Sequence, residues 1–346
     1  MKLSIFQEYL IKQDINLAFF FHPDPSITYF TQKNFSYAIF LITPAKATLY
    51  LTKLDSFPSL SGITSKFLSK DWEKETSSKK IKKIGVNKSL LSIFQQEKLQ
   101  KQFPRAIFID IGEKVNEIRQ KKTLEEIKKM SFACSITSAA FSALIQELGK
   151  KKLKTELDVA LFLEAYIRQQ GAELAFPTIV ASGKNSATPH HITSLEKLTN
   201  GFLQLDFGAK WENYSADMSR VIYLGNPYKK EMKYYDFLLW VQEACIQKVR
   251  EGKSFAELHL FAQKKLGKLS KFFIHTLGHG IGVEVHELPH FKDPEAKVNT
   301  SVPFTIEPGI YFPGKYGLRI EDTLLWNGKK VEILTKATKK LISVSI

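Results

Sequence analysis

Residues 205–220 read LDFGAKWENYSADMSR and contain two aspartates, Asp206 and Asp217, on either side of a short turn-like segment. Two antiparallel strands joined by that turn would bring the two carboxylates together. Taken alone, either aspartate is more typical of a residue that caps a turn. A functional pair therefore requires partners elsewhere in the sequence.

Such partners follow in order along the chain. A glycine-rich segment, GHGIG (278–282), contains His279, and Glu307 and Glu321 lie in the segments TIEPG (305–309) and RIED (319–322). Four carboxylates cannot crowd one pocket without cations between them, because like charges a few ångströms apart repel strongly. Carboxylates can bridge two ions, and imidazole completes the shell. Two metals about 3.5–4 Å apart can share a hydroxide that is nucleophilic at neutral pH. The five residues therefore predict a dinuclear metal site.

Histidines are concentrated around the glycine-rich segment. Three of the chain's eight histidines, His275, His279 and His286, lie within twelve residues. The glycines let the backbone approach a neighbouring group closely, and they argue against a zinc-binding HExxH helix. A hydrogen-bonded histidine of the core would explain one of the three, but not the cluster.

Composition places the chain among soluble globular proteins. It has 346 residues, of which 44% are hydrophobic and 25% charged, enough for two domains. No apolar run approaches the roughly 18 residues of a membrane helix, and Glu8, Lys12 and Asp14 interrupt the N-terminal apolar residues, unlike a signal peptide. The two cysteines, Cys134 and Cys245, are expected to be buried free thiols of a reducing compartment. We therefore expect a cytoplasmic protein without a membrane segment.

The net charge of +15 has two interpretations. It could mark a surface that binds nucleic acid. However, the lysines occur in pairs along the whole chain, as at 79–80, 128–129 and 339–340, and not on one stripe with interleaved aromatic residues. A lysine-rich solvated exterior explains this pattern better, so we do not expect nucleic acid as a partner.

The apolar pattern divides the chain into an α/β module, residues 1–117, and a second module, 118–346. The first alternates short strands with amphipathic helices and offers few polar residues of catalytic character. In the second, Thr123 and Glu126 have the spacing of a capping box that starts a long helix. The second module is also expected to contain a helix that begins near Thr155. The expected strands that bear on the site lie over 178–181, 202–207, 221–224, 303–306 and 318–325. In the first module, a helix is expected over 90–99.

Several of these motifs, taken together, resemble those of a known protein family. The segments DFGA (206–209), SADMSR (215–220), GHGIG (278–282), HELP (286–289), TIEPGIY (305–311) and LRIED (318–322) resemble the pita-bread metallopeptidases, which include prolidase, aminopeptidase P, methionine aminopeptidase and creatinase. The resemblance implies an α+β fold, with a C-terminal pita-bread domain over 118–346. A smaller α/β creatinase-like N-terminal domain would precede it, over 1–117.

The resemblance also assigns roles to the metal-site residues. It implies two divalent metal ions held by Asp206, Asp217, His279, Glu307 and Glu321, with Asp217 and Glu321 bridging both ions. A bridging hydroxide would attack the scissile carbonyl, and Glu307 would shuttle the proton as general base. Mn²⁺ is the expected metal, and Co²⁺, Fe²⁺ and Zn²⁺ also suit this donor set.

Further residues match positions that contact the substrate. His275 and His286 match histidines that contact the substrate and the tetrahedral intermediate. Residues 181–190 resemble a prolidase-type loop whose histidine shapes the pocket, with His190 as the match and His191 as the alternative. Arg319 would either pair with a substrate carboxylate or orient the carboxylates of the site.

Within the family, the complete ligand set and the long N-terminal module favour cleavage before proline. Methionine aminopeptidases usually lack an N-terminal domain of this size, and creatinase uses no metal. The expected activity is therefore that of an Xaa-Pro aminopeptidase or Xaa-Pro dipeptidase acting on peptides with proline at the second position, in a homodimer. The alternative is a non-catalytic protein of the same fold that recruits RNA or a protein partner.

Overall fold

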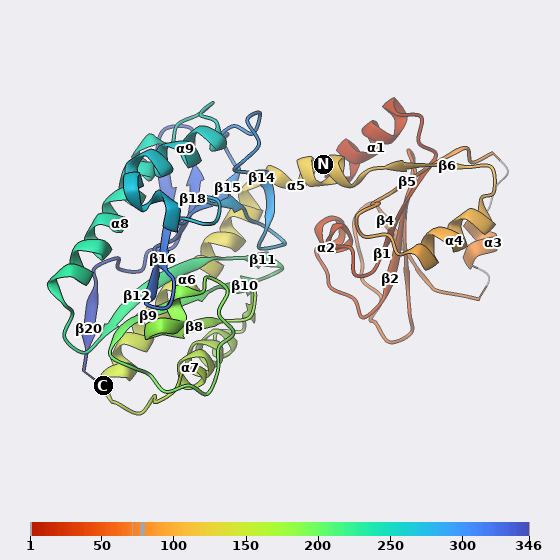
Figure 1. The fold of residues 1–346 in the computed structure, drawn as a ribbon. Helices are drawn as coiled ribbons and strands as arrows, with labels where there is room; N and C mark the ends of the chain where they lie inside the picture. Colours follow the sequence, from red (N-terminus) through yellow and green to blue (C-terminus); the bar gives the residue numbers. More distant parts are fainter. Residues whose placement is uncertain (1, 71, 77–79, 346) are drawn as a thin grey trace. The chain divides into compact units, whose positions relative to one another are not determined.

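The computed structural model describes residues 2–70, 72–76 and 80–345 and separates the chain into two compact units. The first is Met1–Arg119 and the second is Gln120–Ile346 (Figure 1). Each has its own buried apolar core. Among the described residues, no helix combines the length and the apolar character needed to cross a membrane.

A six-stranded mixed sheet forms the centre of the N-terminal unit, in the order β4-β3-β2-β1-β5-β6. Residues of the central strand alternate between two cores: Ala18 and Phe20 pack on one face, and Leu17 and Phe19 on the other. This unit contains strands β1 (Leu17–Phe21), β2 (Ala38–Ile42), β3 (Ala47–Leu51), β4 (Ile63–Phe67), β5 (Lys83–Val86) and β6 (Ile107–Asp110), and helices α1 (Lys2–Lys12), α2 (Pro25–Thr31), α3 (Trp72–Thr76), α4 (Ile93–Gln102) and α5 (Gly112–Gln120).

One expected helix begins later than its apolar pattern indicates. The sequence pattern places a helix over 90–99, whereas α4 begins at Ile93. The cause is local, since the Ser92 side chain accepts from the Gln95 backbone while the Gln95 side chain accepts from the Ser92 backbone. This capping box satisfies two amide groups at the start of the helix and so favours a start at Ile93.

Two helices open the C-terminal unit. A capping box of Thr123 and Glu126 starts α6 (Leu124–Gly149), which confirms the start predicted from the sequence. A second capping box, of Thr155 and Asp158, starts α7 (Glu156–Gln169). The apolar faces of both helices lie in one core with the strands that follow.

Two sheets carry the polar residues of interest. The first has the order β20-β12-β9-β8, and its strands β9 and β12 are antiparallel. The second has the order β14-β13-β15-β18-β19, beside a two-stranded ribbon of β16 and β17. The bounds are β7 (Glu173–Leu174), β8 (Ile179–Ser182), β9 (Gly201–Phe207), β10 (Ala209–Trp211), β11 (Tyr214–Ser215), β12 (Met218–Leu224), β13 (His279–Gly280), β14 (Glu287–His290), β15 (Pro303–Ile306), β16 (Gly309–Phe312), β17 (Tyr316–Arg319), β18 (Asp322–Trp326), β19 (Val331–Ile333) and β20 (Ile342–Val344). The remaining elements are α8 (Lys229–Lys248), α9 (Phe255–Leu266) and two 3-10 helices, η1 (Gly183–Ala187) and η2 (Gly267–Phe272).

The prediction of one continuous strand over 318–325 is wrong. The chain leaves β17 after Arg319 and enters β18, in a different sheet, at Asp322. Between them the Glu321 amide donates to the Ser219 carbonyl of β12 at 3.2 Å. The break therefore joins the two sheets and places Glu321 where they meet. An apolar alternation pattern does not reveal such a change of partner.

Candidate metal centre

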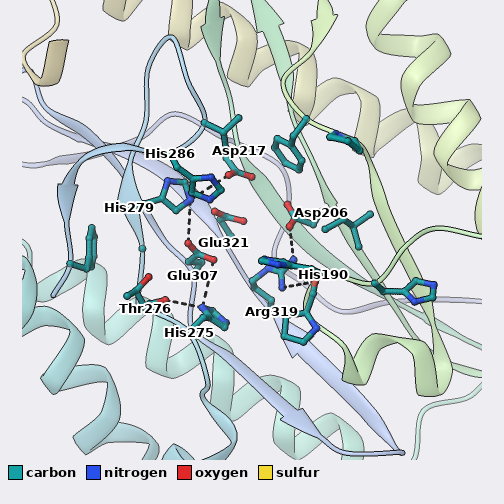
Figure 2. A pocket seen from close by; sticks show the side chains of 18 of the residues that line it. His190, Asp206, Asp217, His275, Thr276, His279, His286, Glu307, Arg319 and Glu321 are labelled. Atoms are coloured by element: carbon teal, nitrogen blue, oxygen red, sulfur yellow. Dashed lines mark hydrogen bonds and ion pairs between the residues drawn. The ribbon is translucent and has the colours of Figure 1, made fainter. Parts of the chain in front are cut away.

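A cavity of about 930 Å³ lies in the C-terminal unit. Its walls combine strands of both sheets with the loop between β8 and β9. All nine polar residues singled out in the sequence line this one cavity (Figure 2): His190, Asp206, Asp217, His275, His279, His286, Glu307, Arg319 and Glu321.

The two aspartates are brought together by the pairing of β9 and β12. Asp206 lies on β9 opposite Ser219, and Asp217 immediately precedes β12. The expected antiparallel arrangement is confirmed, and the connection is the short hairpin of β10 and β11. The Thr323 hydroxyl of β18 accepts from the Asp217 amide at 3.3 Å and donates to its carbonyl at 2.8 Å. Asp217 is therefore fixed from both sheets.

His279 reaches the cavity because the glycine before it allows two backbones to touch. A Cβ atom at Gly278 would lie 2.1 Å from the Thr305 carbonyl oxygen, which is sterically impossible. The Thr305 hydroxyl accepts from the His279 amide at 3.1 Å and donates to Glu307 Oε1 at 3.2 Å. One side chain of β15 thus links the histidine to a glutamate of the site.

The charged groups converge closely. His279 Nε2 lies 3.6 Å from Asp217 Oδ2 and 3.4 Å from Glu307 Oε1. Asp217, His279 and Glu321 each offer one ligand atom within 4.8 Å of the others, a spacing suited to a shared metal ion. The Ser219 hydroxyl donates to Glu321 Oε2 at 2.9 Å.

Three carboxylate oxygens of this cluster have no partner. Among the described residues, Asp206 Oδ1, Asp217 Oδ1 and Glu321 Oε1 are buried without a hydrogen bond. A buried acceptor without a donor is costly, and native proteins rarely leave one unsatisfied. Divalent cations would satisfy all three oxygens and offset the repulsion between the carboxylates. The donor set therefore fits bound metal.

Burial perturbs the titration of these groups. Burial, followed by the neighbouring carboxylates, raises the pKa of Asp217 and Glu321 well above the ordinary range. Burial raises the pKa of Glu307 to about 8, and it lowers the pKa of His279 to about 3. The imidazole is therefore neutral at pH 7, as a metal ligand must be.

A hydrogen bond to the backbone determines the tautomer of His279. Its Nδ1 lies 3.1 Å from the Gly280 carbonyl oxygen, which can only accept. The proton must therefore be on Nδ1, and the Nε2 lone pair faces Asp217 and Glu307. A backbone carbonyl on the far nitrogen is a common way of orienting a ligating histidine.

Arg319 is fully engaged by the protein. Its guanidinium donates to Asp206 Oδ2 at 2.5 Å, to the Tyr311 hydroxyl at 2.7 Å and to the Ser219 hydroxyl at 2.8 Å. The side chain is 3% exposed. Of its two expected roles, this geometry favours orienting Asp206 over binding a substrate carboxylate.

Tyr311 is a site residue to which the sequence analysis gave no role. Its hydroxyl accepts from Arg319, and it lies 3.0 Å from His275 Nε2. His275 Nδ1 lies 2.8 Å from the Thr276 carbonyl, so Nδ1 carries the proton and Nε2 accepts from the tyrosine. Tyr311 follows Glu307 within TIEPGIY, and its place in that motif was the only signal in the sequence.

The adjacent histidines of the β8–β9 loop have different partners. His191 Nε2 lies 2.8 Å from Glu156 Oε2. His190 lies among the residues of the cavity (Figure 2). The pKa values of His275 and His286 are lowered, by burial above all and by His190 among the smaller contributions. Both histidines line the cavity, and His191 is the one held by the Glu156 carboxylate.

Comparison with known proteins agrees with this geometry. The profile of metallopeptidase family M24 matches residues 128–327, and that of the creatinase/prolidase N-terminal domain matches residues 2–121. An Xaa-Pro dipeptidase of Pyrococcus horikoshii is 35% identical over 87% of both chains. A prolidase crystal structure from Pyrococcus horikoshii superposes with a TM-score of 0.91 at 31% identity, over 99% of both chains. An X-Pro aminopeptidase structure from Thermotoga maritima gives 0.88 at 30%, over 98% of this chain and 99% of that one.

Proposed function

The chain belongs to metallopeptidase family M24, and on that premise we propose that it is a metal-dependent exopeptidase that cleaves the bond between an N-terminal residue and proline. The observation that carries the proposal is the set of unpartnered carboxylate oxygens of Asp206, Asp217 and Glu321, which converge beside His279 in one cavity. Relatives named Xaa-Pro dipeptidase and X-Pro aminopeptidase support the specificity.

Five residues would hold two divalent ions: Asp206, Asp217, His279, Glu307 and Glu321. The family resemblance implies that Asp217 and Glu321 would be the ligands shared by both ions, and each has a buried oxygen without a hydrogen bond among the described residues, as Asp206 also has. Mn²⁺ is our first candidate, and Co²⁺, Fe²⁺ and Zn²⁺ suit the same donors. When bound, such ions polarise a carbonyl and make water a nucleophile at neutral pH.

The protein's own groups would handle the protons. Glu307 would take a proton from the attacking water as the new C–O bond forms. It would return that proton to the proline nitrogen as the C–N bond breaks. Its hydrogen bond from the Thr305 hydroxyl keeps the carboxylate facing His279. His275, His286 and His190 line the same cavity and would contact the substrate.

Proline at the second position suits the cavity. The bond before proline has no N–H, and the ring fixes φ, so an enzyme that reads extended backbone donors is poorly matched to it. Part of the cavity wall is apolar and can accept a pyrrolidine ring; its apolar members include Phe176, Pro177, Ile179, Ile192 and Phe291. The proposed substrates include both dipeptides and longer peptides.

The test is metal-dependent hydrolysis. The protein is stripped with a chelator, Mn²⁺ or Co²⁺ is restored, and Ala-Pro is assayed beside Arg-Pro-Pro. We expect cleavage only with metal, and Glu307→Gln should lower kcat by at least about 100-fold. Glu295→Gln, at an exposed position, is the matched control. Full activity of the Glu307 variant would remove its proposed role, and failure to cleave either peptide with metal bound would remove the proposed specificity.

A second candidate is a non-catalytic binder of RNA or a protein partner, which the net charge of +15 favours. The four carboxylates of the proposed metal site count against it, because a protein without catalysis has no need of them. Binding of RNA that weakens steeply with salt, without metal-dependent hydrolysis, would favour this candidate.

We also propose a homodimer. In the N-terminal unit, the rings of Phe57 and Phe67 contact each other with centroids 4.5 Å apart and an interplanar angle of 53°, and the two residues remain 48% and 50% exposed. Such a pair is a candidate contact between copies of the chain. Sedimentation of the wild type beside Phe67→Ser measures whether this contact is used.

A further inference from the structure

The loop between β8 and β9 is fastened to a buried glutamate outside the metal cluster. This loop carries His190, His191, Ile192 and Thr193 into the wall of the cavity. Its two ends lie on strands, and several hydrogen bonds hold its middle, among them those of the Thr193 hydroxyl with the Val180 amide and the Thr178 carbonyl. Glu156, the first residue of α7, lies beneath it with no exposed surface.

The Glu156 carboxylate accepts four hydrogen bonds, two on each oxygen. Oε1 accepts from the Ser182 amide at 2.8 Å and from the Asn185 side-chain amide at 2.9 Å. Oε2 accepts from His191 Nε2 at 2.8 Å and from the Ser194 hydroxyl at 3.1 Å. The donors come from both limbs of the loop, before and after His190. The Glu156 carboxylate therefore links the two limbs of the loop.

The charge of Glu156 is maintained in spite of burial. Burial raises the pKa of a carboxyl, but here the hydrogen bonds from Asn185, Ser182 and His191 outweigh burial and lower the pKa of Glu156. Its position in the first turn of α7 adds the favourable field of a helix N-terminus. Glu156 is thus an ionised acceptor at neutral pH. Since it can only accept, His191 must carry a proton on Nε2.

This arrangement constrains the two neighbouring histidines differently. With its Nε2 held by Glu156, His191 cannot use that nitrogen on a substrate. His190, its neighbour in the chain, is labelled among the side chains of the cavity together with Asp206, His275 and Arg319 (Figure 2). By holding His191, the carboxylate of Glu156 also orients His190, to which it is not hydrogen-bonded.

We propose that Glu156 is a positioning residue for substrate binding, which acts by holding the 183–194 loop so that His190 points into the cavity. The inference rests on the proposed cleavage before proline. It concerns a residue that neither lines the cavity nor contacts the metal cluster in the part of the chain that the structure describes. Its effect should therefore be on substrate affinity and not on the chemical step.

The experiment uses Glu156→Gln in the full-length, Mn²⁺-loaded protein. Glutamine keeps the shape but has one acceptor oxygen for the four donors, so at least one limb of the loop loses its anchor. We expect KM for Ala-Pro to rise at least roughly tenfold, the effect of losing one hydrogen bond to a charged group. We expect kcat to change little. Glu164→Gln, about two turns further along α7, is the matched control.

A double-mutant cycle separates positioning from general destabilisation. If Glu156 acts through His190, then Glu156→Gln should raise KM in the wild-type background but add little in a His190→Ala background. A purely structural role would lower the melting temperature without changing KM, or would change KM equally in both backgrounds. Either result overturns the positioning role.

Failure of the proposed function gives a different result. If the wild type cleaves no Xaa-Pro peptide with metal restored, the proposed function fails and the role of Glu156 falls with it. If the wild type cleaves Ala-Pro and Glu156→Gln keeps the wild-type KM, only the role of Glu156 is overturned.

Discussion

Replacing Lys122 by methionine should destabilise the C-terminal unit, because it removes the ammonium group that pairs with the buried carboxylate of Glu287. Lys122 Nζ lies 2.9 Å from Glu287 Oε2, and the two side chains are 1% and 4% exposed. Glu287 Oε1 also accepts from the Glu284 amide at 3.0 Å, which fixes the turn leading to His286. The ion pair therefore lies directly behind the histidine segment of the cavity.

The magnitude follows from this burial. Removing one partner of a buried pair costs about 3–5 kcal/mol, whereas an exposed pair is worth at most about 1 kcal/mol. With both side chains nearly inaccessible, we expect the larger range. Gly282 shows how closely the pair is enclosed, since a Cβ atom there would lie 2.5 Å from Glu287 Oε2 and 2.7 Å from Lys122 Cε.

The assay is urea unfolding followed by tryptophan fluorescence. Trp211, Trp240 and Trp326 lie in the C-terminal unit, so the signal reports mainly on that unit. The matched control is Lys121→Met at the exposed neighbouring position, which should change the free energy of unfolding by less than about 0.5 kcal/mol. Lys122→Met with Glu287→Gln should recover part of the loss. A loss below about 1 kcal/mol for Lys122→Met would refute the reasoning.

Two further outcomes test the charges of the cavity. In the chelator-treated protein, burial raises the pKa of Glu307 to about 8 and that of Asp217 and Glu321 well above the ordinary range, so the folded chain holds protons that the unfolded chain has released. The free energy of unfolding should therefore fall by roughly 0.8 kcal/mol for Glu307 alone between pH 7.5, above which the histidines are almost wholly neutral in both states, and about pH 9. Bound Mn²⁺ should abolish this slope, as melting curves over the pH series will show. Arg319→Gln should weaken Mn²⁺ binding by about 10–100-fold in calorimetry, because Asp206 loses the donor that orients it, and an unchanged affinity would contradict the role of Arg319.

Local signals in the sequence predict much of this fold. The capping boxes at Thr123 and Thr155 involve residues three apart, and both helices begin where those residues indicate. The pairing of Asp206 and Asp217 through a hairpin also follows from a short segment, because the connection has little freedom. Ser92 and Gln95 form the same kind of signal, but the apolar pattern alone led to a helix that begins too early.

Contacts between residues far apart in the chain could not be predicted from such local signals. Lys122 and Glu287 are separated by 165 positions, and nothing near either residue specifies the other. The hydrogen bonds of Arg319 to Ser219 and Asp206 likewise join strands of different sheets. Such partners are selected by the packing of the whole unit. A resemblance between motifs can indicate which residues belong to a site, but not which side chains hold them in place.

Glu321 and Asp322 are adjacent in the chain, yet their surroundings give them different roles. Asp322 is paired within the protein, whereas Glu321 is a proposed metal ligand. Asp322 is buried with a full set of donors: Arg220 Nη2 at 2.6 Å, Thr335 Oγ1 and Gln242 Nε2 at 2.9 Å, and Lys339 Nζ at 3.1 Å. Glu321 is equally buried, yet one of its oxygens has no partner and its pKa is raised by burial and by neighbouring carboxylates. Two fixed cations already neutralise Asp322, so a metal ion would gain little there. Only Glu321 still needs a cation, and the cavity is where a cation can reach it.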